Sequence, residues 1–306
     1  MLETTRPSAR AYGMPPPAHR LPEATHVGGV HLLVSDLSRS RAFYEDVLGL
    51  RPLRVEAEQV TFGAHGDDRV LVTLQTRPGV TAARRGAFGL YHFALLLPDR
   101  ATLGRFATHL STLGLRVGMA DHLVSEALYL SDPDGLGIEV YADRPQDEWR
   151  HNDRQLTMAS DRLDIGSVIG AAEGVAWAGA PAGTTVGHVH LHVGSLEAAE
   201  AFYHRALGLD KTVWDYPGAL FLSAGGYHHH LGTNTWSPGP APSADRAQLL
   251  SWEIVVPSDA DVADVARSLH AGGYVVSQTA EGVKAADPWG TSVTIREERR
   301  NHVEAR

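Results

Sequence analysis

Three side chains with complementary chemistry occur in one short stretch, DHLVSEALYLSDPDGLGIEVY, which runs from Asp121 to Tyr141. His122 offers an imidazole, Tyr129 a phenol and Glu139 a carboxylate. An imidazole changes its charge near neutral pH and is a common metal ligand, and a carboxylate can complete a metal site. The Asp-Pro-Asp-Gly segment between Tyr129 and Glu139 has the residues of a tight turn, so we expect the stretch to be a hairpin.

The elements that position these residues belong to a repeat. GVHLLVSDLSRSRAFYEDVLGL, from Gly29, and HVHLHVGSLEAAEAFYHRALGL, from His188, both indicate a strand of period two, a turn and a helix that ends at Leu-Gly-Leu. Two weaker copies begin at His92 and Trp252. Further strands bounded by Gly, Pro and Asp follow each copy, which predicts four β-α-β-β-β modules.

The modules divide the chain into two predicted domains. We expect a flexible arm over residues 1–25, modules one and two over 26–143, a linker over 144–185, modules three and four over 186–298, and a tail over 299–306. The middle of the linker has the pattern of a short helix. One module cannot bury both faces of its sheet, so we predict an α+β fold in which modules pair into half-barrels around a cleft.

Composition excludes several functional classes. The formal charge is −9 and no Lys/Arg stripe is present, which argues against a nucleic-acid partner. No apolar run is long enough to span a bilayer, and the first residues lack the apolar segment of a signal peptide, so we expect a cytoplasmic protein with no membrane partner. Cysteine is absent, so any metal must be bound by histidine and carboxylate.

The repeat resembles the vicinal oxygen chelate superfamily, which includes glyoxalases, bleomycin-resistance proteins and extradiol dioxygenases. Within it, the Asp121–Tyr141 stretch is similar to the signature of type I extradiol dioxygenases of the catechol 2,3-dioxygenase kind. The residues that match this signature are His122, Leu128-Tyr129, Asp132-Pro133, Gly135 and Glu139. The resemblance implies an iron enzyme that inserts both atoms of O2 into a catechol-type aromatic diol.

In this superfamily the metal ligands lie on the first and last strands of the modules. The first-strand positions hold Gly29, His92, His188 and Trp252. The last-strand positions hold apolar or Thr residues around 72–74 in module one, Glu139 in module two and Thr294 in module four. The resemblance therefore implies a metal site of His92, Glu139 and His188, a 2-His-1-carboxylate set that suits Fe(II) and also accepts Mn(II).

The resemblance also implies the acid–base groups. The last strand of module three, FLSAGGYHHHLG, is similar to the family strand that carries a histidine acid–base group, here His229. Tyr129 and His122 are expected to hydrogen-bond substrate oxygens and to help deprotonate the diol. Because the predicted metal ligands and acid–base residues are divided between modules two and three, we predict that module two pairs with module three and module one with module four.

Several alternatives stay open. If modules one and two pair instead, His31 replaces His188 as a ligand, and His190 and His192 share the strand face of His188. Alternatively, Tyr129 is an ordinary aromatic residue of a strand, His122 is a loop residue, and the His228–His230 triplet is a strand edge that faces solvent. A glyoxalase-like metal-dependent isomerase or a non-catalytic binding protein of the same fold are the competing functions. The identity of the diol is not readable, and exposed half-barrel edges favour a homo-oligomer without defining it.

Overall fold

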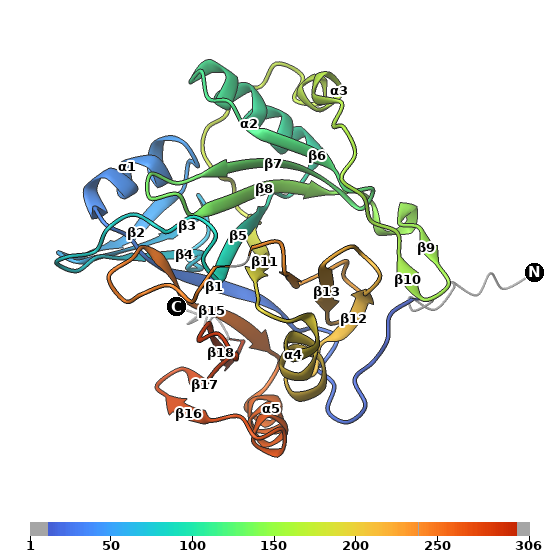
Figure 1. Cartoon of the computed structure of the whole chain (residues 1–306). Helices are drawn as coiled ribbons and strands as arrows, with labels where there is room; N and C mark the ends of the chain where they lie inside the picture. The colour runs from blue at the N-terminus through green and yellow to red at the C-terminus, as the bar shows by residue number, and fades with distance from the viewer. Residues whose placement is uncertain (1–11, 238, 299–306) are drawn as a thin grey trace, which may run out of the picture.

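The computed structural model describes residues 12–237 and 239–298 and contains two eight-stranded curved sheets (Figure 1). Each module has the predicted order of one strand, one helical segment and three strands. Residues 1–11 of the predicted arm and the predicted tail lie outside the described residues. The expectation of a flexible arm is wrong for residues 12–25, because Leu21 is buried and Arg20 forms an ion pair with Asp210 of module three.

One sheet joins module three to module two. Its strands, in spatial order, are β12 (Asp210–Val213), β13 (Ala219–Ser223), β14 (Leu231–Asn234), β11 (Thr185–His192), β5 (Gly89–Leu96), β8 (Gly137–Asp143), β7 (Ser125–Ser131) and β6 (Gly118–Asp121).

The other sheet joins module four to module one. Its strands, in spatial order, are β16 (Val276–Thr279), β17 (Gly282–Ala286), β18 (Ser292–Glu297), β15 (Gln248–Val256), β1 (His26–Leu33), β4 (Val72–Gln75), β3 (Gln59–Gly63) and β2 (Arg51–Val55). The two central pairs, β5 with β11 and β1 with β15, are both antiparallel. This order confirms the predicted pairing of module two with three and of module one with four.

The helices cover the outer sides of the sheets, as Figure 1 shows for α2 above β7 and β8 and for α5 beside β16 and β17. The helical segments are α1 (Leu37–Asp46), α2 (Arg100–Thr112), α4 (Leu196–Ala199) with the π-helical η2 (Glu200–Ala206), and α5 (Asp259–Ala271). Each module's helix starts at a residue whose side chain accepts a hydrogen bond from a first-turn backbone N–H, and these caps are Asp36, Asp99, Ser195 and Ser258. None of the helices within the described ranges combines the length and apolar character that a membrane crossing requires.

The linker is structured. It contains η1 (Gln146–Glu148), a small hairpin of β9 (His151–Asn152) and β10 (Gln155–Leu156), and α3 (Ile165–Gly170), which packs on α2. The short helix predicted in the middle of the linker is confirmed as α3.

The two modules within each half of the sequence are tied together by matching Tyr–Asp contacts. The Tyr44 hydroxyl of α1 donates to Asp132 of module two at 3.4 Å, and the Tyr203 hydroxyl of η2 donates to Asp287 of module four at 2.9 Å. Asp132 Oδ1 also accepts from the backbone N–H groups of Asp134 and Leu136, and Gly135 adopts a φ of +85°. The Asp-Pro-Asp-Gly segment is thus a structural turn, as predicted, and it holds the hairpin that ends in Glu139.

Candidate metal centre

The predicted ligands come from three adjacent strands. Ala94 of β5 is the register partner of both Glu139 on β8 and His188 on β11, so these three residues form one row across the sheet. His92 lies two residues before Ala94 on β5 and therefore on the same face. Ala94 is fully buried, and its small side chain leaves room for the longer side chains on either side to meet above it.

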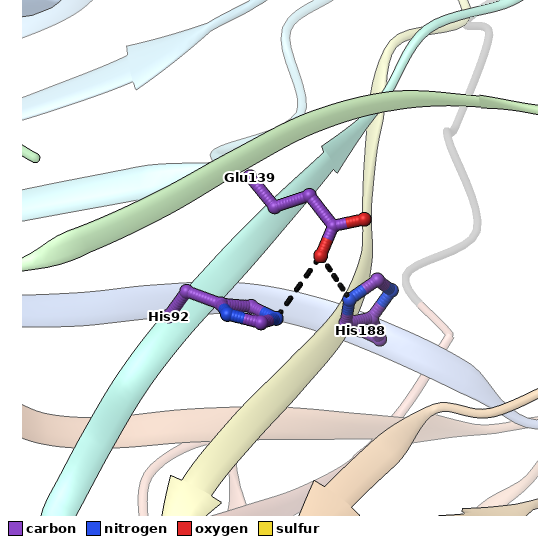
Figure 2. Close-up of side chains that lie close together, drawn as sticks. All are labelled: His92, Glu139 and His188. Atoms are coloured by element: carbon purple, nitrogen blue, oxygen red, sulfur yellow. Dashed lines mark hydrogen bonds and ion pairs between the residues drawn. The ribbon is translucent and has the colours of Figure 1, made fainter. Parts of the chain in front are cut away.

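The side chains of His92, Glu139 and His188 converge on one point (Figure 2). Glu139 Oε2 lies 3.0 Å from His92 Nε2 and 3.1 Å from His188 Nε2. The exposed fraction is 5% for His92, 2% for Glu139 and 1% for His188. Within the described residues this is the one group of His and acidic side chains that could hold a metal ion.

Two observations indicate that the group fits a metal ion. His92 Nε2 is buried and makes no hydrogen bond of acceptable geometry, although the carboxylate is close by. In addition, two donor atoms that each lie about 2.1 Å from one ion, at right angles to each other, are about 3 Å apart. The spacing of both imidazole nitrogens from Glu139 matches that separation.

The protonation states also suit a metal ligand set. Burial lowers the pKa of His92 and of His188, which favours the neutral imidazole that a metal binds, although Glu139 partly offsets the effect. Burial alone would raise the pKa of Glu139, but the neighbouring imidazoles of His188 and His92 outweigh it and hold this pKa well below its usual value. The centre therefore offers a carboxylate and two neutral nitrogens.

His122 and Tyr129 form a hydrogen-bonded pair next to this centre. His122 lies in the turn between β6 and β7, and its Nδ1 is 2.6 Å from the carbonyl oxygen of Ala159. A carbonyl only accepts, so Nδ1 carries the proton, and His122 Nε2 accepts from the Tyr129 hydroxyl at 2.5 Å. Burial, reinforced by Glu139, raises the pKa of Tyr129 well above its usual value, which keeps the phenol protonated.

His229 lies on the other side of the centre, against His188. The two ring centroids are 4.1 Å apart, and burial followed by the neighbouring imidazoles lowers the pKa of His229 well below its usual value. The predicted strand position is wrong, because residues 228–230 form the loop before β14. The solvent-facing alternative is also wrong, since all three histidines are buried.

The other candidate histidines occupy different positions. His190 has its Nε2 bound by the side-chain amide of Asn234 at 2.9 Å, so that nitrogen already has a partner. His192 Nδ1 donates to the oxygen of the same amide at 2.6 Å. His31 lies on β1 in the sheet of modules one and four, so it does not replace His188 in the group.

The centre opens into a cavity of about 170 Å³, whose walls come from both modules and from the linker. The predicted residues His92, His122, Tyr129, Glu139 and His229 line it. Sequence analysis did not identify the other lining residues, which include Met158, Ala159 and Ser160 of the linker and the aromatic residues Tyr91, Tyr216, Phe221 and Trp236, and it named His190 only as a residue on the strand face of His188. The linker residues carry no repeat signal that could have identified them.

Tyr91 owes its position to a β-bulge. His92 pairs with His190 and Leu90 pairs with Leu191, so Tyr91 has no partner on β11. A bulge redirects the side chain of the extra residue, and the Tyr91 ring packs on His92 and His192 with centroid distances of 4.9 Å and 4.7 Å. Tyr91, His92 and Tyr129 also line a larger groove of about 930 Å³, so these three residues lie between the inner cavity and the outer groove.

Register identifies the corresponding positions in the other half-barrel. In the sheet of modules one and four, His31 pairs with Ser251, and this pair corresponds to His190 with His92. In the same sheet Glu253 pairs with Thr294, and this pair corresponds to Ala94 with Glu139. The counterparts of His92, Glu139 and His188 are therefore Ser251, Thr294 and Gly29. The predicted position of Trp252 is wrong by one residue, which places its side chain on the opposite face, in the hydrophobic core.

Known proteins support the same assignment of fold and family. The family model of the Glyoxalase/Bleomycin resistance protein/Dioxygenase superfamily matches residues 24–140 and 185–299. A catechol-2,3-dioxygenase of Bacillus subtilis (strain 168) is 41% identical over 272 residues, which cover 87% of this chain and 95% of that protein.

Solved structures share the fold at low sequence identity. A protein of Bacillus subtilis subsp. subtilis str. 168, provisionally assigned as a dioxygenase, aligns with a TM-score of 0.66 and 15% identity over 92% of this chain and 87% of that one. Glyoxalase I from Zea mays aligns with a TM-score of 0.57 and 17% identity over 90% of this chain and 92% of that one. Together with the family match over both halves, the four modules and their paired sheets lead to one conclusion: the chain belongs to the glyoxalase, bleomycin resistance protein and dioxygenase superfamily.

Proposed function

We propose that this protein is an extradiol dioxygenase that opens the ring of a catechol-type diol, with Fe(II) held by His92, Glu139 and His188. The observation that carries the proposal is that these three buried residues meet beside a cavity lined by His92 and Glu139 together with Tyr129, His122 and His229. The 41% identity to a catechol-2,3-dioxygenase supports the same reaction class. Mn(II) accepts the same ligands, so the choice of Fe(II) rests on the reaction.

The ligand set determines how many positions remain for reactants. Two imidazoles and one carboxylate occupy one face of an ion and leave adjacent positions open. Fe(II) bound there would supply the sites at which a bidentate diol and O2 come together. The surrounding side chains exclude bulk water, because His92, Glu139 and His188 are almost completely buried.

Tyr129 and His122 can take a proton from the diol. The proton of the Tyr129 hydroxyl is directed to His122 Nε2, so the phenolic oxygen presents its lone pairs to the cavity. A diol hydroxyl can donate to that oxygen while Tyr129 passes its own proton to His122. The carbonyl oxygen of Ala159, which accepts from His122 Nδ1, stabilises the resulting imidazolium.

His229 is a second acid–base group, separated from the first by the ligands. Its ring packs against His188 with a centroid distance of 4.1 Å, whereas the Tyr129 ring packs near His92 with a centroid distance of 5.5 Å. Its lowered pKa keeps it neutral near pH 7, so it can accept a proton from a substrate and return it to the ring-opened product. The two groups can therefore act on different oxygens of the bound reactants.

Oxygen uptake tests the proposal. The protein is purified without air, loaded with Fe(II) and given a panel of catechols, and O2 consumption is followed together with the yellow colour of a ring-opened product. Both signals are expected with at least one catechol. If iron-loaded protein gives neither signal with any catechol or hydroquinone, the dioxygenase proposal is wrong, and turnover of a substrate without O2 would favour a glyoxalase-like isomerase.

A further inference from the structure

A row of polar side chains connects His229 to the edge of the half-barrel. His228 Nδ1 lies 2.7 Å from His229 Nδ1, and His228 Nε2 lies 2.9 Å from Asp143 Oδ1. The side chain of His228 has no exposed surface, whereas that of Asp143 is 25% exposed. Asp143 belongs to β8 of module two and His228 to module three, so the row crosses the same module junction as the metal ligands.

The hydrogen-bonding capacity of each group determines where the protons are. A carboxylate only accepts, so the proton of His228 is on Nε2. A neutral imidazole has one donor and one acceptor, so in the neutral form of His228 its Nδ1 accepts the proton of His229 Nδ1. His229 Nε2 is then left without a proton.

The surroundings hold His228 in this orientation. The Tyr227 hydroxyl donates to the same Asp143 oxygen at 3.2 Å, and Tyr141 is hydrogen-bonded to Tyr227 at 2.6 Å. The Tyr227 ring lies against His228 with a centroid distance of 4.1 Å, and Trp149 packs on His228 at 5.3 Å. A flip of the His228 ring would break both of its hydrogen bonds inside this packing.

The free nitrogen of His229 is available to the cavity. No hydrogen bond within residues 12–237 and 239–298 uses His229 Nε2, and this residue lines the cavity of the metal centre. Glu139, Tyr141 and Asp143 alternate along β8 and therefore share one face of the strand. One strand thus carries a predicted metal ligand and the carboxylate at the end of the row.

We propose that Asp143, acting through His228, is a positioning residue that holds His229 in the Nδ1–H tautomer and presents Nε2 to the cavity as a proton acceptor. The effect on turnover rests on the proposed function, but the tautomer itself does not. His229 is the second acid–base group of the proposed reaction, and Asp143 is not among the residues that line the cavity.

The tautomer of His229 can be measured directly in the metal-free protein. Long-range ¹H–¹⁵N correlation spectra of ¹⁵N-histidine-labelled protein distinguish protonated from unprotonated ring nitrogens, and a His229→Gln variant assigns the signals. In the wild type we expect a protonated Nδ1 and an unprotonated Nε2. A protonated Nε2 on His229 would overturn the proposal, and the wild-type protein itself gives this readout once the signals are assigned.

Asp143→Leu removes the acceptor for His228, and Tyr227→Phe is the matched control because it removes one hydrogen bond to Asp143 but keeps the carboxylate that accepts from His228 and the ring that packs on it. We expect Asp143→Leu to populate the Nε2–H tautomer of His229, and Tyr227→Phe to give the wild-type pattern. In the iron-loaded enzyme, Asp143→Leu should lower kcat about 10- to 100-fold with KM little changed. An unchanged His229 tautomer in folded Asp143→Leu would contradict the proposal. If the tautomers are as expected but the wild type consumes no O2 with catechols, the proposed function fails while this inference stands.

Discussion

The two half-barrels have the same strand order and different interiors. In the half-barrel of modules two and three, the cavity face carries His92, Glu139 and His188, whereas the matching positions of modules one and four hold Ser251, Thr294 and Gly29. One fold thus supports a charged, ligand-rich face in one copy and a face without the ligand set in the other. Function depends on the side chains placed on the fold and not on the fold itself.

In the second half-barrel, an arginine compensates the charge of the acidic side chain Glu253. Glu253 Oε2 accepts from Arg296 Nε at 2.9 Å and from the backbone N–H of Gly29 at 3.1 Å. Its register counterpart in the first half-barrel is Ala94, the small residue over which the ligands meet. A guanidinium from the same sheet therefore satisfies Glu253, whereas Glu139 faces two neutral imidazoles and is left for a cation.

Loss of the carboxylate should have the largest effect. Glu139→Gln keeps the shape and removes the charge, so we expect bound iron to fall to trace levels and kcat/KM with a catechol to fall about 1000-fold or more, roughly 4 kcal/mol of transition-state stabilisation. Metal analysis and O2 uptake measure both quantities. Thr294→Val, at the matching position, should retain wild-type iron and activity. Full iron binding by Glu139→Gln would remove Glu139 from the ligand set.

Tyr129 offers the next test, because Lys284 is its register counterpart beside Thr294. Tyr129→Phe should keep the metal but lower kcat about 100-fold, since it removes the hydroxyl that passes the diol proton to His122. Lys284→Met should leave kcat unchanged. Steady-state kinetics on iron-loaded protein measure this effect. Wild-type turnover by Tyr129→Phe would show that the Tyr129 hydroxyl takes no part in the reaction and that the ring only packs.

The Glu253–Arg296 pair should matter for stability alone. The two side chains are 25% and 18% exposed, so Arg296→Met leaves a mostly buried carboxylate without its cation, and we expect the free energy of unfolding to fall by about 1–2 kcal/mol. Chemical denaturation measures this change, while iron content should not change. The double variant Glu253→Gln/Arg296→Met should recover part of the loss, because the amide oxygen can still accept from Gly29. Loss of iron in Arg296→Met would mean that the two half-barrels are functionally coupled.

The Asp132 turn should make stability depend on pH. Burial raises the pKa of Asp132 to about 6 from an ordinary 3.8, so between those pH values the folded state binds more protons than the unfolded state. Stability should therefore decrease as pH rises from about 4 to about 6, by up to about 2–3 kcal/mol for this one group. Asp132→Asn keeps the oxygen that accepts from Asp134 and Leu136 and should flatten this part of the pH–stability curve. An identical slope in the variant and the wild type would exclude Asp132 as its source.

The sequence, together with the family resemblance, was sufficient to predict the module order, the pairing of modules and the three side chains that converge. Those features depend on a repeat in which strand period, helix caps and glycine stops agree, and on His, Glu and His at matching register. The alignment of positions along a strand was less accurate. It assigned Trp252 to the position that Ser251 occupies, and an error of one residue exchanges the cavity face of a strand for its core face.

The features that the sequence could not reveal depend on local irregularity and long-range contact. Tyr91 enters the cavity region through a bulge, and the linker contributes Ala159 as the hydrogen-bond partner of His122. The His228–His230 triplet is a loop, and His228 is hydrogen-bonded to Asp143, which is 85 residues away in the sequence. Neither a bulge nor such a distant contact leaves a periodic pattern in the sequence.

The most direct test of the account compares two histidines from the two half-barrels, His188 and His31. Wild type, His188→Ala and His31→Ala are loaded with Fe(II) without air, and bound iron is measured together with O2 uptake in the presence of a catechol. We predict about one iron per chain and O2 uptake for the wild type and His31→Ala, and neither for His188→Ala, because the ligand set lies in the half-barrel of modules two and three. Iron and activity retained in His188→Ala but lost in His31→Ala would contradict that location of the active site.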